Sequence, residues 1–198
     1  MDEVFRLGWF EDKGLRKRCL EFLAEKSRQY AGAGVLEDDT RSIFVEPVLR
    51  GLGWDTLDHE QVDREQPGDR RGGIVGDIHL THGGRLLAVI EAKPLHDPRI
   101  ADADEQLRRY VVENLFLAPP GTHNAGMRFE FGGKYFVRGA VTNGELWKVY
   151  DFTRGVANPA EDVRLVCEFA LQGGVGAEDL LRTLGRRHLL RELGLAPS

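Results

Sequence analysis

The chain is predicted to adopt an α/β fold in which helices flank a mixed central sheet. Helical and strand-like patterns alternate along the sequence, and two strand pairs with turn signals, at residues 74–94 and 135–152, supply the centre of the sheet. The 198 residues are 41% hydrophobic and 30% charged. That balance is typical of a soluble globular protein with a buried core and excludes a disordered chain.

The composition also limits where in the cell we expect the protein and which partners we expect it to bind. No apolar run reaches transmembrane length, and the N-terminal residues lack the pattern of a secretory signal, so we expect no membrane association. Cys19 and Cys167 stand far apart, without metal-binding or redox spacing, which predicts two buried thiols in a cytoplasmic protein. The net charge of −5 argues against a protein that simply coats a polyanion.

Two helices are expected before the first strand. Residues 11–31 carry apolar side chains along one stripe, as in an amphipathic helix. The second helix covers residues 40–52 and has Asp39 or Thr40 as its capping residue. Pro47 lies inside this pattern, which predicts a kink or an early break.

The middle of the chain is expected to supply the first strands. Residues 54–62 form one strand, and residues 63–73 form a polar loop. Residues 74–81 and 86–93 then form a hairpin, because a glycine-containing turn separates two apolar runs.

The second half of the chain begins with a helix that starts at its capping residue Asp97, has Pro98 in the first helical position and ends before Pro119. Asn143-Gly144 is a strong hairpin-turn signal, because both residue types tolerate a positive φ. The other predicted elements are a loop at 119–133, strands at 135–142 and 146–152, and helices at 159–171 and 177–193.

Three charged side chains gather at the end of the first hairpin. Side chains alternate faces along a strand, so Glu91 and Lys93 share one side, and Asp77 on the neighbouring strand lies across from them. Two carboxylates so close repel each other unless a cation lies between them, and Mg²⁺ suits carboxylates together with water and phosphate oxygens. Such a metal activates water, and an adjacent lysine offsets transition-state charge. The cluster therefore suits phosphodiester hydrolysis; the alternative is a solvated strand end.

Further candidate residues flank this cluster. Gln106 and Tyr110 lie four residues apart on one helix face, where they can bind a phosphate, a base or water, or else form an ordinary surface pair. Arg108 projects nearby and either contacts nucleic acid or pairs with a neighbouring glutamate. Arg70 and Arg71 stand in a glycine-rich loop that is either a phosphate contact or a solvated segment.

These motifs resemble those of the PD-(D/E)XK nuclease superfamily, in which an aspartate on one strand is followed by (D/E)-x-K on the next. Here they are Asp77 and Glu91-Ala92-Lys93, with Gly76 in place of the usual proline. The segment 106–110, QLRRY, matches the Q-x-x-x-Y element of RecB-like and type I restriction nucleases. The segment 141–150, VTNGELWKVY, resembles the TNG-x-x-W hairpin in the N-terminal nuclease domain of type I restriction R subunits.

The resemblance covers about residues 38–154 and implies a restriction-endonuclease-like core with the element order α-β-β-β-α-β. Residues 1–37 would form an N-terminal helical extension and residues 155–198 a C-terminal helical appendage. The implied activity is hydrolysis of DNA with Mg²⁺, for which Mn²⁺ could substitute. A homodimer, or partner subunits of a restriction system, would fit the same family.

The resemblance also assigns roles. Asp77 and Glu91 would hold the metal with the Ala92 carbonyl, and Lys93 would position the attacking water. Glu46 stands on the helix that often carries a further acidic residue in this family, so it is either an extra ligand through water or a surface glutamate. The substrate-binding set would be Gln106, Tyr110, Arg70, Arg71 and Arg108.

Two other functions stay open on the sequence. One is a catalytically inactive module that keeps the nuclease fold and binds nucleic acid or a protein partner. The other is a plain α/β domain that binds a small acidic ligand or another protein. Gly76 and the acidic balance favour the first of these, whereas the intact aspartate, glutamate and lysine favour the nuclease.

Overall fold

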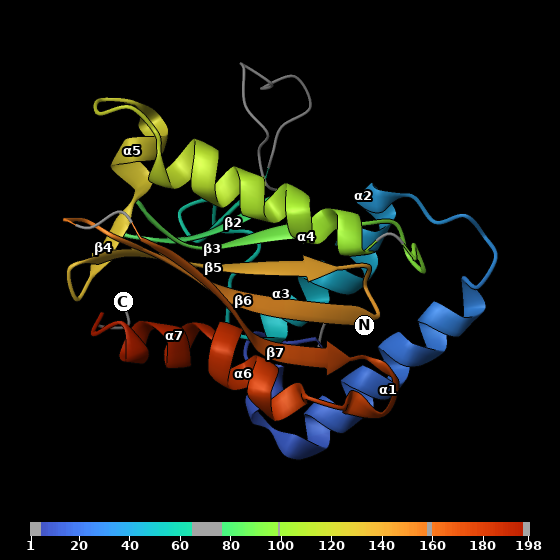
Figure 1. Cartoon of the computed structure of the whole chain (residues 1–198). Coiled ribbons are helices and arrows are strands. Elements are labelled where there is room, and N and C mark those ends of the chain that lie inside the picture. Colours follow the sequence, from blue (N-terminus) through green and yellow to red (C-terminus); the bar gives the residue numbers. More distant parts are fainter. Residues whose placement is uncertain (1–4, 65–76, 99, 158–159, 196–198) are drawn as a thin grey trace.

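A computed structural model describes residues 5–64, 77–98, 100–157 and 160–195. It confirms an α/β fold: a mixed seven-stranded sheet has helices on both faces (Figure 1). The strand order is β1-β2-β3-β5-β6-β7, with β4 paired to β5; β3 and β5 run parallel, and the other neighbours are antiparallel. The strands are β1 (Val62–Arg64), β2 (Ile78–His82), β3 (Arg85–Ala92), β4 (Phe129–Phe131), β5 (Lys134–Thr142), β6 (Leu146–Gly155) and β7 (Glu161–Ala170).

The helices divide the core into two hydrophobic clusters, one on each face of the sheet. One face is covered by α4 (Ile100–Arg109), its π-helical continuation η3 (Tyr110–Phe116) and α5 (His123–Met127). The opposite face carries α1 (Lys13–Gln29), α2 (Glu37–Thr40), the π-helical turn η2 (Arg41–Val45), α3 (Glu46–Gly51), α6 (Ala177–Leu184) and α7 (Arg186–Glu192). Two short 3-10 turns, η1 (Trp9–Glu11) and η4 (Gln172–Gly174), complete the set of helical elements.

The hairpin that carries the predicted site is confirmed for its described residues. β2 and β3 pair antiparallel, with His82 opposite Arg85. The turn between them is Gly83-Gly84, with φ angles of 57° and 72°. Glycine takes positive φ at both turn positions without steric cost, which fixes the register of this tight turn.

The helix predicted at 40–52 starts earlier than expected. It begins at Glu37, with Leu36 in the capping position, so neither Asp39 nor Thr40 caps it. Acidic residues in the first turn favour this start through the helix dipole. Pro47, at the beginning of α3, causes no break, because the wider turn of η2 precedes it and the helix continues.

The strand predicted at 54–62 is wrong over most of its length, because strand β1 starts only at Val62. The side chain of Asp55 accepts the Leu57 N–H at 3.1 Å, and that of Asp58 accepts the Glu60 N–H at 2.9 Å. Such local bonds compete with strand pairing, so the segment forms turns.

The helix predicted at 159–171 is also wrong, because residues 161–170 form β7 and pair with β6 along its whole length. The single helix predicted at 177–193 is two helices that meet at Gly185. A side chain there would stand 2.2 Å from the Leu181 carbonyl oxygen, so only glycine fits this bend. Expected C-terminal helices are thus partly replaced by a sheet strand.

The structure also differs from three smaller predictions. The described helix after β3 begins at Ile100, beyond the predicted start at Pro98, but it does end before Pro119. The loop predicted at 119–133 contains α5 and β4. In the Asn143-Gly144 turn only the glycine has a positive φ, of 85°.

Two of the expectations from composition can be compared with the structure. Cys19 and Cys167 are buried thiols outside any disulfide, as predicted, and burial raises the pKa of each to about 11. Within the described ranges, no helix combines the length and apolar character needed to cross a membrane.

Candidate active site

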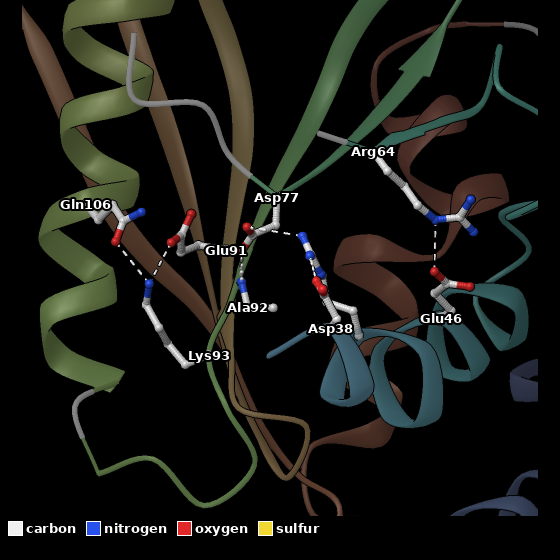
Figure 2. A network of polar contacts seen from close by, with 9 residues as sticks. Asp38, Glu46, Arg64, Asp77, Glu91, Ala92, Lys93 and Gln106 are labelled. Atoms are coloured by element: carbon white, nitrogen blue, oxygen red, sulfur yellow. Dashed lines mark hydrogen bonds and ion pairs between the residues drawn. The ribbon is translucent and has the colours of Figure 1, made fainter. Parts of the chain in front are cut away.

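Asp77 and Glu91 lie side by side at one end of the β2–β3 hairpin (Figure 2). The ladder pairs Ile78 with Ile90, so the next residue on each strand is one of the two acids. Both side chains are buried, with residue exposures of 7% for Asp77 and 2% for Glu91. An Asp77 carboxylate oxygen, Oδ2, accepts the backbone N–H of Ala92 at 2.6 Å, which fixes that side chain against β3.

Lys93 completes the cluster and connects it to α4. Its Nζ donates to Glu91 Oε1 at 2.7 Å and to Gln106 Oε1 at 3.0 Å. Gln106 reaches this position because the parallel pairing of β3 and β5 requires a crossover, and α4 is the helix of that crossover. The lysine is therefore held at two points, by a buried carboxylate and by a helix side chain.

Burial dominates the electrostatics of the two acids. It raises the pKa of Asp77 to about 6, although the Ala92 N–H opposes the shift. It raises the pKa of Glu91 to about 7, and the neighbouring Asp77 charge adds to the shift. Burial disfavours the charged form of Lys93, but its pairing with Glu91 outweighs this and raises the pKa of Lys93. The cluster thus contains two carboxyl groups that resist being charged together.

Two residues of the helix beginning at Glu37 also face this cluster. Arg41 Nη1 lies 3.4 Å from Asp77 Oδ1, and the other end of its guanidinium pairs with Asp38. Glu37 lines a cavity of about 320 Å³ together with Lys93, Pro94, Asp97, Asp102 and Gln106, and its charge acts on the pKa of both buried acids.

Sequence reasoning missed Glu37 because it started this helix at Thr40. It missed Arg41, which lies inside the predicted helix, because its contact with Asp77 depends on how the helix packs against the hairpin. The run Glu37-Asp38-Asp39 was a usable signal, since acids favour the first turn of a helix. A start at Glu37 would have placed its side chain on the helix instead of in the preceding loop.

Glu46, predicted as an extra ligand, pairs elsewhere. Its Oε1 accepts from Arg64 Nε at 2.8 Å (Figure 2). Arg64 also donates to the Thr56 carbonyl at 2.8 Å. The helix does bring an acid to the site, but that residue is Glu37, which stands two to three turns earlier.

The predicted substrate-binding residues have different surroundings. Gln106 joins the cluster through Lys93, whereas Tyr110 is 3% exposed and stacks on His79 with a centroid separation of 5.5 Å. Burial raises the pKa of Tyr110 and lowers that of His79 to about 4, so the His79 ring is neutral. Arg108 is exposed on α4. Arg70 and Arg71 lie outside the described residues.

The donor set of this site suits a hard divalent cation. Among the described residues, no group of three or more histidine, cysteine, aspartate or glutamate side chains is arranged to hold a metal. Asp77 and Glu91, however, supply two adjacent hard oxygen donors whose charged forms are disfavoured by burial and by each other. A dication between them would relieve both penalties, and Mg²⁺ commonly takes only one or two protein carboxylates.

The arrangement as a whole combines buried acids, a fixed ammonium and a bordering cavity. Such a combination can bind a cation, orient a water molecule and offset negative charge on a bound anion. In the comparisons with known proteins, no family model, no curated protein and no solved structure matches the chain.

Proposed function

We propose that the protein is a metal-dependent nuclease that hydrolyses phosphodiester bonds of DNA. The observation that carries the proposal is the juxtaposition of buried Asp77 and Glu91 with Lys93, which Gln106 holds in place. The element order α2–α3, β1, β2, β3, α4, β5 is compatible with the restriction-endonuclease-like core that the motifs imply. Its two hairpin strands and the following helix supply the proposed site.

Asp77 and Glu91 would hold Mg²⁺ or Mn²⁺, with the Ala92 carbonyl as a further donor. The bound metal would supply an acidified water and neutralise charge on the phosphate. The Lys93 ammonium would orient the attacking water by donating a hydrogen bond, and its charge would stabilise the negative phosphate oxygens as the bond breaks. Gln106 would keep the ammonium in position by accepting a second hydrogen bond.

The surrounding residues support these roles. Glu91 is the main cause that raises the pKa of Lys93, and the charge of Glu37 adds to this shift. Tyr110 stacks on His79 and so fixes α4–η3, with Gln106 one turn earlier, against the sheet. Arg108 on the exposed side of α4, together with Arg70 and Arg71, would contact the DNA backbone.

A second candidate is a module that keeps this fold without catalysis and binds nucleic acid or a protein. One observation favours it: each buried acid already has a cation of the protein beside it, Arg41 at Asp77 and Lys93 at Glu91. Such internal pairing satisfies the acids without a metal.

The deciding experiment is cleavage of circular single-stranded DNA and of supercoiled double-stranded DNA with Mg²⁺, Mn²⁺ or EDTA. Lys93→Ala is compared with Lys134→Ala, which removes an exposed lysine on β5. We expect metal-dependent nicking that falls by about a hundredfold or more in Lys93→Ala and is unchanged in the control.

Cleavage that persists in Lys93→Ala would exclude this site. If circles stay intact, linear DNA of both kinds tests exonuclease action with the same variants. Salt-sensitive DNA binding without cleavage of any substrate would establish the non-catalytic module instead.

A further inference from the structure

Strand β7 forms one margin of the sheet (Figure 1). Its first half is exposed. All five residues from Glu161 to Leu165 are exposed, whereas Cys167 and Phe169 are buried under α6 and its neighbours. In the described part of the chain, the outer edge of β7 is paired only at its far end, where Ala170 bridges to Val175. A ten-residue strand with an open edge is a template for another strand.

The exposed half of β7 carries two apolar side chains on one face. Val163 pairs with Phe152 of β6, and Leu165 pairs with Tyr150. Both β6 residues belong to the cluster on the α4 side of the sheet, yet Val163 is 39% exposed and Leu165 is 47% exposed. The α4 helix therefore does not cover the margin of the sheet, and an apolar strip continues to its edge.

The opposite face of the same segment carries charges of both signs. Asp162 and Arg164 stand two residues apart, with Val163 between them, so their side chains point to the same side. Arg164 Nη2 lies 3.0 Å from Asp151 Oδ2, but the Arg164 side chain is still 71% exposed and can accept a second acidic partner. The sequence Asp-Val-Arg is thus self-complementary when it meets an antiparallel copy of itself.

We propose that β7 pairs antiparallel with β7 of a second copy of this chain, with Val163 on the two-fold axis. This register sets Asp162 of each copy opposite Arg164 of the other, and opposite charges across a strand pair are favourable. It also brings the two Val163 side chains together on the apolar face. The interface is isologous, and it joins the two sheets into one continuous sheet.

The charges favour this register over the two registers that are shifted by one residue. An axis at Arg164 would set the two arginines against each other, and an axis at Asp162 would do the same for the two aspartates. Like charges directly opposite destabilise a strand pair. Sheet edges are often protected from pairing with another chain by lysine side chains or by proline. The described residues 161–170 contain no lysine and no proline.

The test measures the mass of the full chain by sedimentation or light scattering, from low micromolar to several hundred micromolar protein. We expect a concentration-dependent dimer. Asp162→Arg places arginine opposite Arg164 at both ends of the interface and should weaken the dimer by about tenfold or more. The double variant Asp162→Arg, Arg164→Asp exchanges the two charges and should restore it. Circular dichroism checks that each variant is folded.

Hydrogen exchange supplies a readout that needs no variant. Among residues 161–166, the backbone amides that point to the open edge should be protected at high protein concentration and exchange faster at low concentration, while the buried strand β3 stays protected at both. A wild-type monomer over the whole range overturns the proposal, as does a dimer that Asp162→Arg leaves intact or that the double variant fails to restore. The proposal does not depend on nuclease activity, so either can fail alone.

Discussion

Glu91 shows how a single buried carboxyl group can tie stability to pH. In the unfolded chain its pKa has the ordinary value of 4.5, whereas in the folded protein burial and the Asp77 charge raise the pKa to about 7. The folded state therefore binds the proton more tightly than the unfolded state between these two values. Stability contributed by this group is fully present below the lower pKa and is lost as the pH rises through the higher one.

The first prediction follows from that sign. Replacing Glu91 with glutamine removes the ionisable group. As the pH rises from 4.5 to about 7, the free energy of unfolding of wild type should therefore fall by about 2 kcal/mol relative to that of Glu91→Gln. Urea titrations of both proteins across this range, with EDTA present, measure the difference. Added Mg²⁺ should reduce the loss in wild type, because a ligand that binds only the folded state stabilises it. A difference that is independent of pH would contradict the burial argument.

The second prediction separates two glutamates of one helical segment. Glu37 lines the cavity beside Lys93, whereas Glu46 is held by Arg64 away from it. Glu37→Gln should lower the rate of DNA cleavage by about tenfold or more, and Glu46→Gln, the matched control, should keep the rate within about twofold of wild type. Single-turnover cleavage at saturating Mg²⁺ tests this. Equal losses in the two variants would mean that the helix acts through stability and not through Glu37.

At the scale of single residues, the sequence was sufficient to predict which side chains of a hairpin lie next to each other. Asp77, Glu91 and Lys93 meet because strand alternation and a two-residue turn determine their positions, and both are local properties. The choice between Glu37 and Glu46 depended on where a helix starts and on a partner, Arg64, from another element. Neither could be derived from helical periodicity.

The turn between β5 and β6 packs against two segments that carry residues of the candidate site. Lys93 donates its backbone N–H to the Thr142 carbonyl at 2.8 Å, next to this turn. Gly144 follows with φ of 85°, and a Cβ there would stand 3.1–3.2 Å from atoms of Phe44, Thr40 and Leu95. Thr40 in turn accepts the backbone N–H of Leu95 at 2.8 Å. The turn thus packs between the helix of Arg41 and the loop that follows Lys93.

The third prediction uses a pair of glycines with the same backbone angle. Gly144 and Gly121 have φ values of 85° and 84°, but a Cβ on Gly121 would meet nothing within 4 Å. Both alanine substitutions incur backbone strain of about 1 kcal/mol, and Gly144→Ala adds a packing cost of about 1–2 kcal/mol. Thermal or urea unfolding of the two variants measures the difference. Equal destabilisation would show that the neighbours of Gly144 move aside freely.

Elements whose signals are local were the ones that the sequence could predict. The α1 helix, the β2–β3 hairpin and strands β5 and β6 agree with their periodicities and turn residues. The segment that forms β7 alternates apolar and polar residues over most of its length, so a strand signal was present that the helix predicted at 159–171 did not use. Val166 interrupts the alternation, at the point where the pairing register with β6 shifts. Pairing with β6 along the whole strand then stabilises this conformation.

Across the whole molecule, a buried arginine joins the sheet to the C-terminal helices. Arg138 stands on β5 with a side-chain exposure of 3%, and its Nε lies 2.8 Å from Asp151 Oδ1. Its Nη2 donates to both carboxylate oxygens of Glu192 at 2.9 and 3.0 Å, and its Nη1 donates to the Thr183 carbonyl. A buried cation so fully paired stabilises one arrangement of α6 and α7 against the sheet.

The fourth prediction compares this network with a surface pair. Arg138→Met leaves Asp151 and Glu192 without their shared partner and should destabilise the protein by about 3 kcal/mol or more. Arg28→Ala removes an exposed pair with Glu25 and should cost less than about 1 kcal/mol. Urea unfolding of both variants gives the two values. A loss below about 1 kcal/mol for Arg138→Met would mean that the network contributes nothing beyond its packing.

Hydrogen bonds and ion pairs between residues far apart in the sequence have a consequence for folding during synthesis. The Trp54 indole N–H donates to the Leu184 carbonyl at 2.8 Å, and the Arg186 N–H donates to the Leu52 carbonyl, also at 2.8 Å. On the ribosome, Trp54 is made long before α6 and α7, and Arg138 before its partner Glu192. The hydrophobic cluster on the α6–α7 face of the sheet therefore cannot be completed until residues up to Glu192 have been synthesised, whereas the cluster on the α4 face contains no residue of these two helices.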